Sequence, residues 1–157
     1  MRVLLVEDDE NKWSQVSSFV KDTVPGIQLE IARSLQSGLR VVRASPPDLI
    51  LLDMTLPTYD VGPDEPGGQI HPLGGREFLA QMDRFDIGVP VIVVTQFETF
   101  GKDRDVMKLS DLDIDLRKRY GKIYRGTVYY HAAFDDWKES LRRYIQGNQP
   151  GDVSGGR

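Results

Sequence analysis

The sequence predicts an α/β fold built on a parallel sheet of five strands. Short runs of apolar residues bounded by polar ones recur along the chain. Such runs are typical of strands that are buried on both faces. Segments with apolar residues at helical spacing lie between them. This alternation favours parallel strands joined by right-handed crossovers.

The first half of the chain is expected to hold three strands and two helices. The strands are expected at residues 2–6, 27–32 and 49–52, and the helices from residue 9 or 10 to about 23 and from 35 to about 43. In the first helix Trp13, Val16, Phe19 and Val20 share one face, which should be buried. Ser34 is a residue type that caps helix N-termini, so it is expected to begin the second helix.

The second half is expected to hold two more strands and three helices around a long loop. The strands are expected at residues 89–95 and 127–131, and the helices at 76–84, about 106–120 and 134 to about 146. Residues 57–75 are rich in Pro and Gly, so we expect neither helix nor strand there. The final helix should bury Phe134, Trp137, Leu141 and either Tyr144 or Ile145. The Gly-rich tail, residues 147–157, is expected to be disordered.

Composition excludes several classes of protein. The 157 residues, 39% hydrophobic and 28% charged, are typical of one globular domain. A net charge of −4 argues against general nucleic-acid binding. Without cysteine, neither disulfides nor a thiolate metal site can form. No signal peptide or run of transmembrane length is present, so we expect a cytoplasmic protein with no membrane contact.

Acidic residues follow two of the expected strands directly. Glu7 and Asp8 come after the first strand, and Asp53 comes after the third. In open α/β sheets the ligand site lies beyond the carboxyl ends of the strands, so these side chains should meet at one rim. Clustered carboxylates repel one another unless a cation or a proton neutralises them, and oxygen ligands suit Mg²⁺. The sequence therefore predicts a magnesium site.

Three segments form a recognisable set: 3–9 (VLLVEDD), 47–57 (PDLILLDMTLP) and 90–95 (PVIVVT). With these segments the chain resembles the receiver domain of the response regulators of two-component signalling. The resemblance implies a flavodoxin-like fold with strand order 2-1-3-4-5. It covers residues 1–146 as a single domain, with insertions at about 58–74 and about 99–126.

The resemblance also implies a chemistry for the acidic rim. Asp53 would accept a phosphoryl group from a histidine kinase or a phosphotransfer protein. Asp8 and Asp53 would bind Mg²⁺ directly, Glu7 would act through a water molecule, and the main-chain carbonyl of Thr55 would be a further ligand. Independently, a carboxylate is a poor nucleophile toward an anionic phosphoryl donor, and a bridging Mg²⁺ offsets that repulsion.

Two further residues would transmit the change. By resemblance, Thr95 would hydrogen-bond the phosphoryl group and shift on activation, and Tyr129 occupies the position of the family's aromatic switch. A strand-end hydroxyl that moves toward a new anion converts a local charge into a change of surface. The signal would then reach a downstream protein whose identity the sequence does not show.

The chain departs from the family after the fifth strand. Receivers carry Lys-Pro there, and this chain has Ala132-Ala133. The aspartyl phosphate would then lack its usual cationic partner. The substitutes that the sequence offers are His131, Lys102, Lys122 and Arg125.

The second insertion carries alternating charges. Its expected helix holds Asp111, Asp113 and Asp115, followed by the basic run at 117–119. We interpret it as a solvated helix with charge of both signs and as a candidate partner surface. It lacks the glycine and distal glutamate of an EF-hand.

The sequence thus favours an atypical single-domain response regulator that is phosphorylated on Asp53 and signals by protein contacts. It is not expected to be an enzyme beyond its own phosphorylation and dephosphorylation. The alternative is a pseudo-receiver, an adaptor with the same fold that works without phosphorylation. A haloacid-dehalogenase-type phosphohydrolase needs an acid two residues after its nucleophile, and position 55 is Thr. No Gly-rich phosphate loop supports a nucleotide-binding fold.

Overall fold

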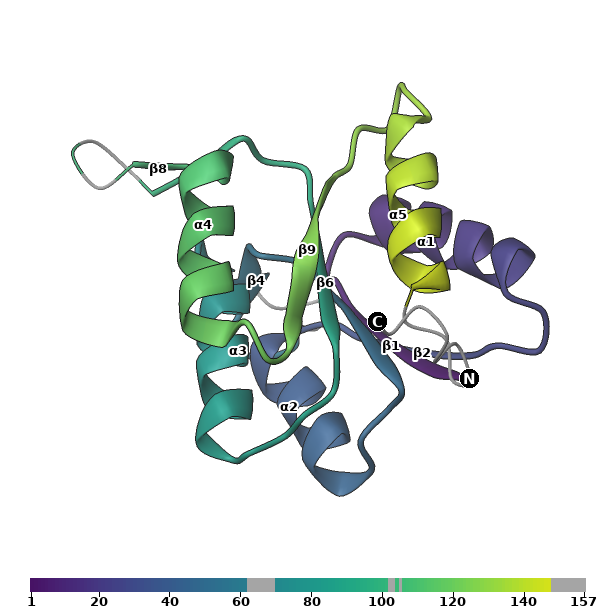
Figure 1. The fold of residues 1–157 in the computed structure, drawn as a ribbon, viewed down its shortest axis with the longest axis horizontal. Helices are drawn as coiled ribbons and strands as arrows, with labels where there is room; N and C mark the ends of the chain where they lie inside the picture. Colours follow the sequence, from purple (N-terminus) through teal and green to yellow (C-terminus); the bar gives the residue numbers. More distant parts are fainter. Residues whose placement is uncertain (62–69, 102–103, 105, 148–157) are drawn as a thin grey trace.

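A parallel five-stranded sheet forms the centre of the molecule (Figure 1). The structure, a computed structural model, describes residues 1–61, 70–101, 104 and 106–147. The strands are β1 (Arg2–Val6), β2 (Gln28–Ala32), β3 (Leu49–Leu52), β6 (Val91–Thr95) and β9 (Tyr124–Tyr129). Their spatial order is β2-β1-β3-β6-β9, which confirms the predicted order 2-1-3-4-5.

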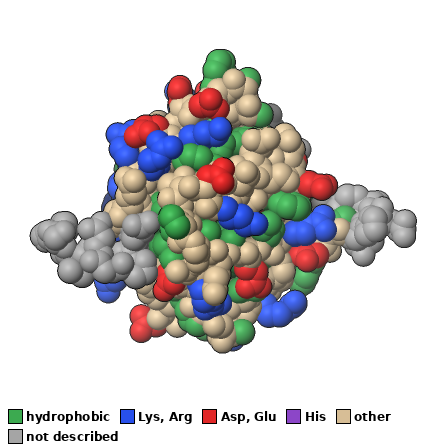
Figure 2. Space-filling view, turned by 90° about the vertical axis from the view of Figure 1, so that its right-hand side faces the viewer, with side chains coloured by type: hydrophobic (Ala, Val, Ile, Leu, Met, Phe, Trp, Pro, Cys, Tyr) green, Lys and Arg blue, Asp and Glu red, His purple; other side chains and the backbone are tan. Residues whose placement is uncertain are grey.

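Helices cover both faces of the sheet (Figure 1). Helices α1 (Glu10–Thr23) and α5 (Asp136–Gln146) lie on one face, and α2 (Leu35–Ala44), α3 (Gly74–Arg84) and α4 (Leu109–Tyr120) lie on the other. Each face has its own apolar core, because alternate residues of each strand point to opposite sides. On the face covered by α1 and α5, acidic and basic side chains are interspersed at the surface (Figure 2).

The predicted cap of the second helix is confirmed. The Ser34 hydroxyl accepts a hydrogen bond from the Ser37 amide at 3.1 Å, and the Ser37 hydroxyl accepts one from the Ser34 amide at 3.1 Å. This capping box satisfies two amides that a helix start leaves without partners. The helix then buries Leu35, Leu39 and Val42, as the spacing predicts.

The expectation that residues 57–75 contain no regular structure is wrong at both ends. Strand β4 (Leu56–Pro57) pairs antiparallel with β5 (Ile70–His71), and residues 62–69 lie outside the described part. Helix α3 begins at Gly74, two residues before the predicted start. Gly74 and Gly75 suggest a loop because glycine disfavours helices. Here they begin a helix, because its first turn packs against the backbone that follows β3 and leaves no room for a larger side chain.

The second insertion also holds a short strand pair. Strands β7 (Thr99–Phe100) and β8 (Met107–Lys108) form an antiparallel pair, and α4 therefore begins at Leu109 instead of about 106. Leu112 and Leu116 anchor α4 in the core, and its acidic and basic side chains pair at i,i+4, which confirms a helix with a charged outer face.

Two corrections concern the last elements. Strand β9 begins at Tyr124 and ends at Tyr129, so the prediction of 127–131 was displaced toward the C-terminus. A register shift places the extra residue Arg125 between the partners of Val91 and Ile92, and this charged bulge hid the start of the strand. Phe134 is 61% exposed and not buried, because α5 begins only at Asp136.

The tail expected to be disordered, apart from Gly147, lies outside the described residues. Among the helices of the described part, none has the length and apolar character needed to cross a bilayer.

Candidate functional site

Glu7, Asp8 and Asp53 lie together at the carboxyl ends of β1 and β3, as predicted. These strands pair in parallel with Val6 beside Leu52, so the residues that follow them emerge at one level. Side-chain oxygens of Glu7, Asp8 and Asp53 lie within 4.8 Å of one another. Glu7 and Asp53 are buried, and Asp8 is half-buried.

A lysine that sequence reasoning missed lies inside this cluster. The Lys12 ammonium is 2.6 Å from Glu7 Oε1 and 3.1 Å from Asp53 Oδ1. It also donates to the main-chain carbonyl of Val94 at 2.8 Å. Lys12 is 1% exposed, although lysine is almost never fully buried unless it is paired. One signal was present: Lys12, Val16 and Val20 are spaced at i, i+4 and i+8, so position 12 continues the buried stripe of α1.

The cluster carries excess negative charge. Three carboxylates and one ammonium give a formal charge of −3 + 1 = −2 when all are ionised. Burial, together with the charge of Asp53, raises the pKa of Glu7 to about 8 and also raises the pKa of Asp8. Burial alone would lower the pKa of Lys12, but the charges of Asp53 and Glu7 outweigh it and raise that pKa.

These observations fit a divalent cation. The donors are all oxygens, they converge within 4.8 Å, and they carry two more negative charges than the single ammonium offsets. Hard cations such as Mg²⁺ prefer such oxygen ligands. The acidic cluster can therefore hold a metal ion at the end of the sheet.

The backbone around Asp53 is held by neighbouring elements. Its amide donates to the Val6 carbonyl at 3.0 Å, and Oδ1 accepts from the Met54 amide at 2.8 Å. The Gly75 amide donates to the Met54 carbonyl at 2.8 Å. A Cβ on Gly75 would lie only 2.6 Å from the Asp53 carbonyl oxygen, so the start of α3 approaches this turn as closely as glycine permits.

Thr95 and Tyr129 are neighbours across the last strand pair. They are register partners at the ends of β6 and β9, and Thr95 is fully buried while Tyr129 is 38% exposed. The Thr95 hydroxyl accepts a hydrogen bond from the Phe97 amide at 3.2 Å. Thr95 follows Val94, whose carbonyl binds Lys12, so both lie at the same end of the sheet as the cluster.

Thr55 lies in the bend between β3 and β4. Its hydroxyl donates to the Pro72 carbonyl at 3.0 Å and so ties this bend to the segment before α3. The role expected for its main-chain carbonyl stays a prediction.

The substitute cations suggested by the sequence are not at the acidic cluster in the described part of the chain. Lys122 and Arg125 lie at the start of β9, the opposite end of the sheet from Asp53. His131 is exposed, and its Nδ1 accepts from the Ala133 amide at 3.1 Å. Lys102 lies outside the described residues.

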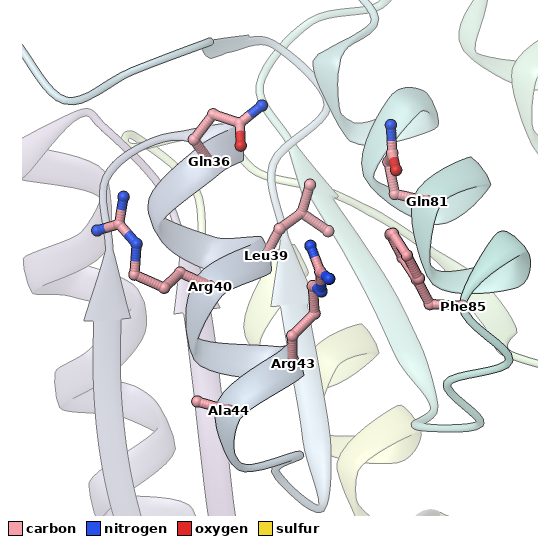
Figure 3. A pocket seen from close by; sticks show the side chains of 7 residues that line it. All are labelled: Gln36, Leu39, Arg40, Arg43, Ala44, Gln81 and Phe85. Carbon is pink, nitrogen blue, oxygen red and sulfur yellow. The ribbon is translucent and has the colours of Figure 1, made fainter.

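A separate hollow of about 550 Å³ lies between α2 and α3 (Figure 3). Leu39 and Arg43 of α2 face Gln81 and Phe85 at the end of α3, and the Arg43 guanidinium stacks 4.2 Å from the Phe85 ring. None of its lining residues belongs to the acidic cluster.

The sequence is similar to known proteins over most of its length. It is 39% identical over 145 residues to the uncharacterized protein y4jR of Sinorhizobium fredii, covering 90% of this chain and 95% of that protein. It is 28% identical over 147 residues to the Detocs response regulatory protein DtcB of Enterobacter cloacae, covering 92% of this chain and 98% of that protein. No family model matches the chain.

Solved structures of receiver domains share the fold of this chain. The signal receiver domain of a putative LuxO repressor protein from Vibrio parahaemolyticus superposes with a TM-score of 0.65 at 22% identity, covering 99% of this chain and 98% of that one. The chain is therefore similar to response regulators, and its fold is that of their receiver domains. The receiver fold is shared also with the Mn²⁺-bound form of response regulator Rcp1, with a TM-score of 0.61 at 22% identity and coverage of 93% and 91%.

Position 132, where the resemblance leads us to expect lysine, lies beyond the end of β9. Ala132 is exposed and lines a cavity of about 320 Å³ together with Asp9, Asn11 and Tyr130. Among the described residues, the cationic side chain at the acidic cluster is Lys12, which comes from α1.

Proposed function

We propose that the chain is a response regulator that accepts a phosphoryl group on Asp53 in a Mg²⁺-dependent reaction and signals through protein contacts. One observation carries this proposal: a buried carboxylate at the end of the third strand is grouped with two further carboxylates within 4.8 Å and with an ammonium at 3.1 Å. Receivers generally interact with histidine kinases or phosphotransfer proteins, and we propose such a donor here, in the cytoplasm.

The proposed step is a phosphoryl transfer to the Asp53 carboxylate. An oxygen of Asp53 attacks the donor's phosphorus, and a new O–P bond forms. The bond between phosphorus and the donor's leaving atom breaks, and its electron pair stays with the donor, on a histidine nitrogen or an acyl oxygen. When bound, Mg²⁺ supplies positive charge to the phosphoryl oxygens and keeps the attack in line. Glu7, Asp8, Asp53 and the Thr55 carbonyl would hold it.

Thr95 would move when Asp53 is phosphorylated. Its hydroxyl now accepts from the Phe97 amide at 3.2 Å, and it would donate to a phosphoryl oxygen in the phosphorylated state. Displacement of Thr95 toward the phosphoryl group would release the segment that begins at Phe97, which is 40% exposed. Tyr129 is the register partner of Thr95, and its side chain would then move inward after Thr95. The protein surface around the rings of Phe97 and Tyr129 would change as a result.

The alternative is a pseudo-receiver adaptor, and one observation favours it. Lys12 contacts Glu7 and Asp53 at once, so part of the charge is offset without a metal ion or a phosphoryl group. However, the three carboxylates exceed the charge of Lys12 by two when all are ionised, and burial and the charge of Asp53 raise the pKa of Glu7 to about 8. Without a metal ion Glu7 relieves this repulsion by holding a proton, which a divalent cation could displace.

Intact-mass spectrometry separates the two proposals. The protein is incubated with Mg²⁺ and a small phosphodonor such as acetyl phosphate, in parallel with Asp53→Asn and with EDTA. A single phosphoryl adduct that is absent from Asp53→Asn and from the EDTA sample supports the phosphoacceptor. No adduct from acetyl phosphate, phosphoramidate or a panel of histidine kinases supports the adaptor.

A further inference from the structure

We infer that Lys12 of α1 is the catalytic cation of this receiver and hydrogen-bonds the phosphoryl group on Asp53, in place of a lysine after the last strand. The inference rests on the proposed function, since it assigns a residue to that same reaction. It starts from a finding: the cation at the acidic cluster enters from the first helix and not from β9.

Three oxygen atoms, at or just beyond the carboxyl ends of three different strands, surround the ammonium. Glu7 follows β1, Asp53 follows β3 and Val94 belongs to β6, at distances of 2.6, 3.1 and 2.8 Å. An ammonium has three N–H donors, so each can have one acceptor. Lys12 is also the only lysine or arginine that is buried in the described part of the chain. A charge so placed is fixed in position and weakly screened by solvent.

The position at the end of β9 cannot supply this cation. Ala132 has no charge, and Tyr130 turns its ring toward the site instead. That ring lies 5.9 Å from the Lys12 ammonium, packs 5.0 Å from the Trp137 ring and is 3% exposed. The face of the aromatic ring attracts a cation, so Tyr130 favours the Lys12 ammonium at this place.

Helix geometry explains how a lysine reaches the cluster from α1. Lys12 lies one turn and two turns before Val16 and Val20, which are buried against the sheet. The helix begins directly beyond β1, so its first turn lies over the carboxyl ends of the strands. The four-carbon stem of lysine can lie among apolar groups while its ammonium reaches the polar rim.

The ammonium is placed for phosphoryl transfer. It already forms an ion pair, at 3.1 Å, with Oδ1 of the carboxylate that would react. As negative charge builds on the transferring group, one N–H can turn from Asp53 to a phosphoryl oxygen while the Val94 carbonyl keeps the ammonium in place. A preorganised donor of this kind typically contributes a factor of about 10²–10³ to a reaction rate.

The test compares initial labelling rates with acetyl phosphate at saturating Mg²⁺ for four proteins: wild type, Lys12→Met, Lys12→Arg and the double variant Lys12→Met/Ala132→Lys. Lys21→Met is the matched control, because it removes an exposed lysine from the same helix. Circular dichroism and Mg²⁺ affinity by calorimetry establish that each variant is folded and binds the metal. We expect Lys12→Met to label about 10²-fold more slowly than wild type, and Lys21→Met to match wild type.

Partial recovery in Lys12→Arg or in the double variant would tie the defect to the missing charge and not to packing. If Lys12→Met proves unfolded, the polar variant Lys12→Gln takes its place: slower labelling by a folded Lys12→Gln supports the inference, and labelling at the wild-type rate overturns it. A folded Lys12→Met that labels at the wild-type rate overturns it and leaves the proposed function intact. Absence of labelling in wild type with every donor overturns the proposed function, and this inference with it.

Discussion

The Lys12 ammonium lies 3.1 Å from Oδ1 of Asp53, and this pair joins the first helix to the end of the third strand at the centre of the site. The buried carboxylate that we propose as phosphoacceptor is therefore paired with a buried cation. Because Lys12 also contacts Glu7 at 2.6 Å, the same cation balances part of the charge of the expected metal ligands. The consequences of this arrangement can be measured.

The stability of the metal-free protein should fall as pH rises. The pKa of Glu7 is about 8 in the fold against an ordinary value of 4.5, so between these values the folded state holds more protons than the unfolded state. Raising pH from about 5 to about 8 therefore lowers the free energy of unfolding, by at most about 1.4 kcal/mol per pH unit for one proton. Urea unfolding in EDTA at several pH values measures this slope.

Mg²⁺ should reduce that dependence, because it favours the ionised form of Glu7. Calorimetric titrations at pH 7 in buffers of different ionisation enthalpy should then show proton release on binding. Stability that rises from pH 5 to pH 8 without metal would contradict the charge balance described for the cluster.

Asp53→Asn should lower the pKa of Asp8. The charge of Asp53 is, after burial, the main cause of the raised pKa of Asp8, and asparagine removes that charge while keeping the shape. NMR titration of side-chain carboxyl carbons without metal measures the change. An unchanged pKa of Asp8 would mean that the two carboxylates are further apart than described.

Gly75→Ala should destabilise the protein and slow labelling of Asp53. The new Cβ would lie 2.6 Å from the Asp53 carbonyl oxygen and 2.9 Å from Met54 Cα, and these are backbone atoms that cannot simply rotate away. We expect a loss of about 1–3 kcal/mol from this overpacking, which exceeds the gain of about 1 kcal/mol in helix propensity. Gly88→Ala is the control, because a Cβ there meets nothing within 4 Å. Equal unfolding midpoints for the two variants would refute the close approach.

Ser34→Ala should lower the stability of the protein without changing the labelling rate of Asp53. It removes the hydroxyl that accepts from the Ser37 amide at 3.1 Å, and the loss of such a cap costs about 1 kcal/mol. The hydroxyl also bonds the Asp60 carboxylate, whose pKa is lowered by that bond. Urea unfolding of Ser34→Ala, with the exposed Ser18→Ala as control, measures the cost, and the labelling rate of both should equal that of wild type.

Much of the architecture could be predicted because local pattern and tertiary structure agree. The buried runs at β1 and β3 are apolar throughout, and the acidic residues that follow them are brought together by a simple property of parallel strands. Ser34 is a residue type that caps helices, so its position as N-cap could also be predicted from the sequence. The reciprocal bond to the Ser37 hydroxyl could not, because the usual motif has Glu or Gln at that position. Each of the predicted features follows from residues that are neighbours in the sequence or from the general geometry of parallel sheets.

The errors arose where tertiary contacts override local preference. Gly74 and Gly75 suggested a loop, yet they begin a helix because α3 must approach the backbone beyond β3. Arg125 concealed the start of β9 because it forms a bulge. The sequence pattern does not place Lys12 at the site, because a lysine at a buried helical position is usually unfavourable. The carboxylates of Glu7 and Asp53, from two other segments, make it stable there.

The measurement that tests the central claim most directly is the position of the phosphoryl group in the protein after treatment with Mg²⁺ and a phosphodonor. Reduction of the acyl phosphate with borohydride, followed by peptide mass spectrometry, identifies the modified residue. The account predicts a single modified site at Asp53, lost in Asp53→Asn and prevented by EDTA. Modification of a different residue, or a signal that persists in Asp53→Asn, would contradict it.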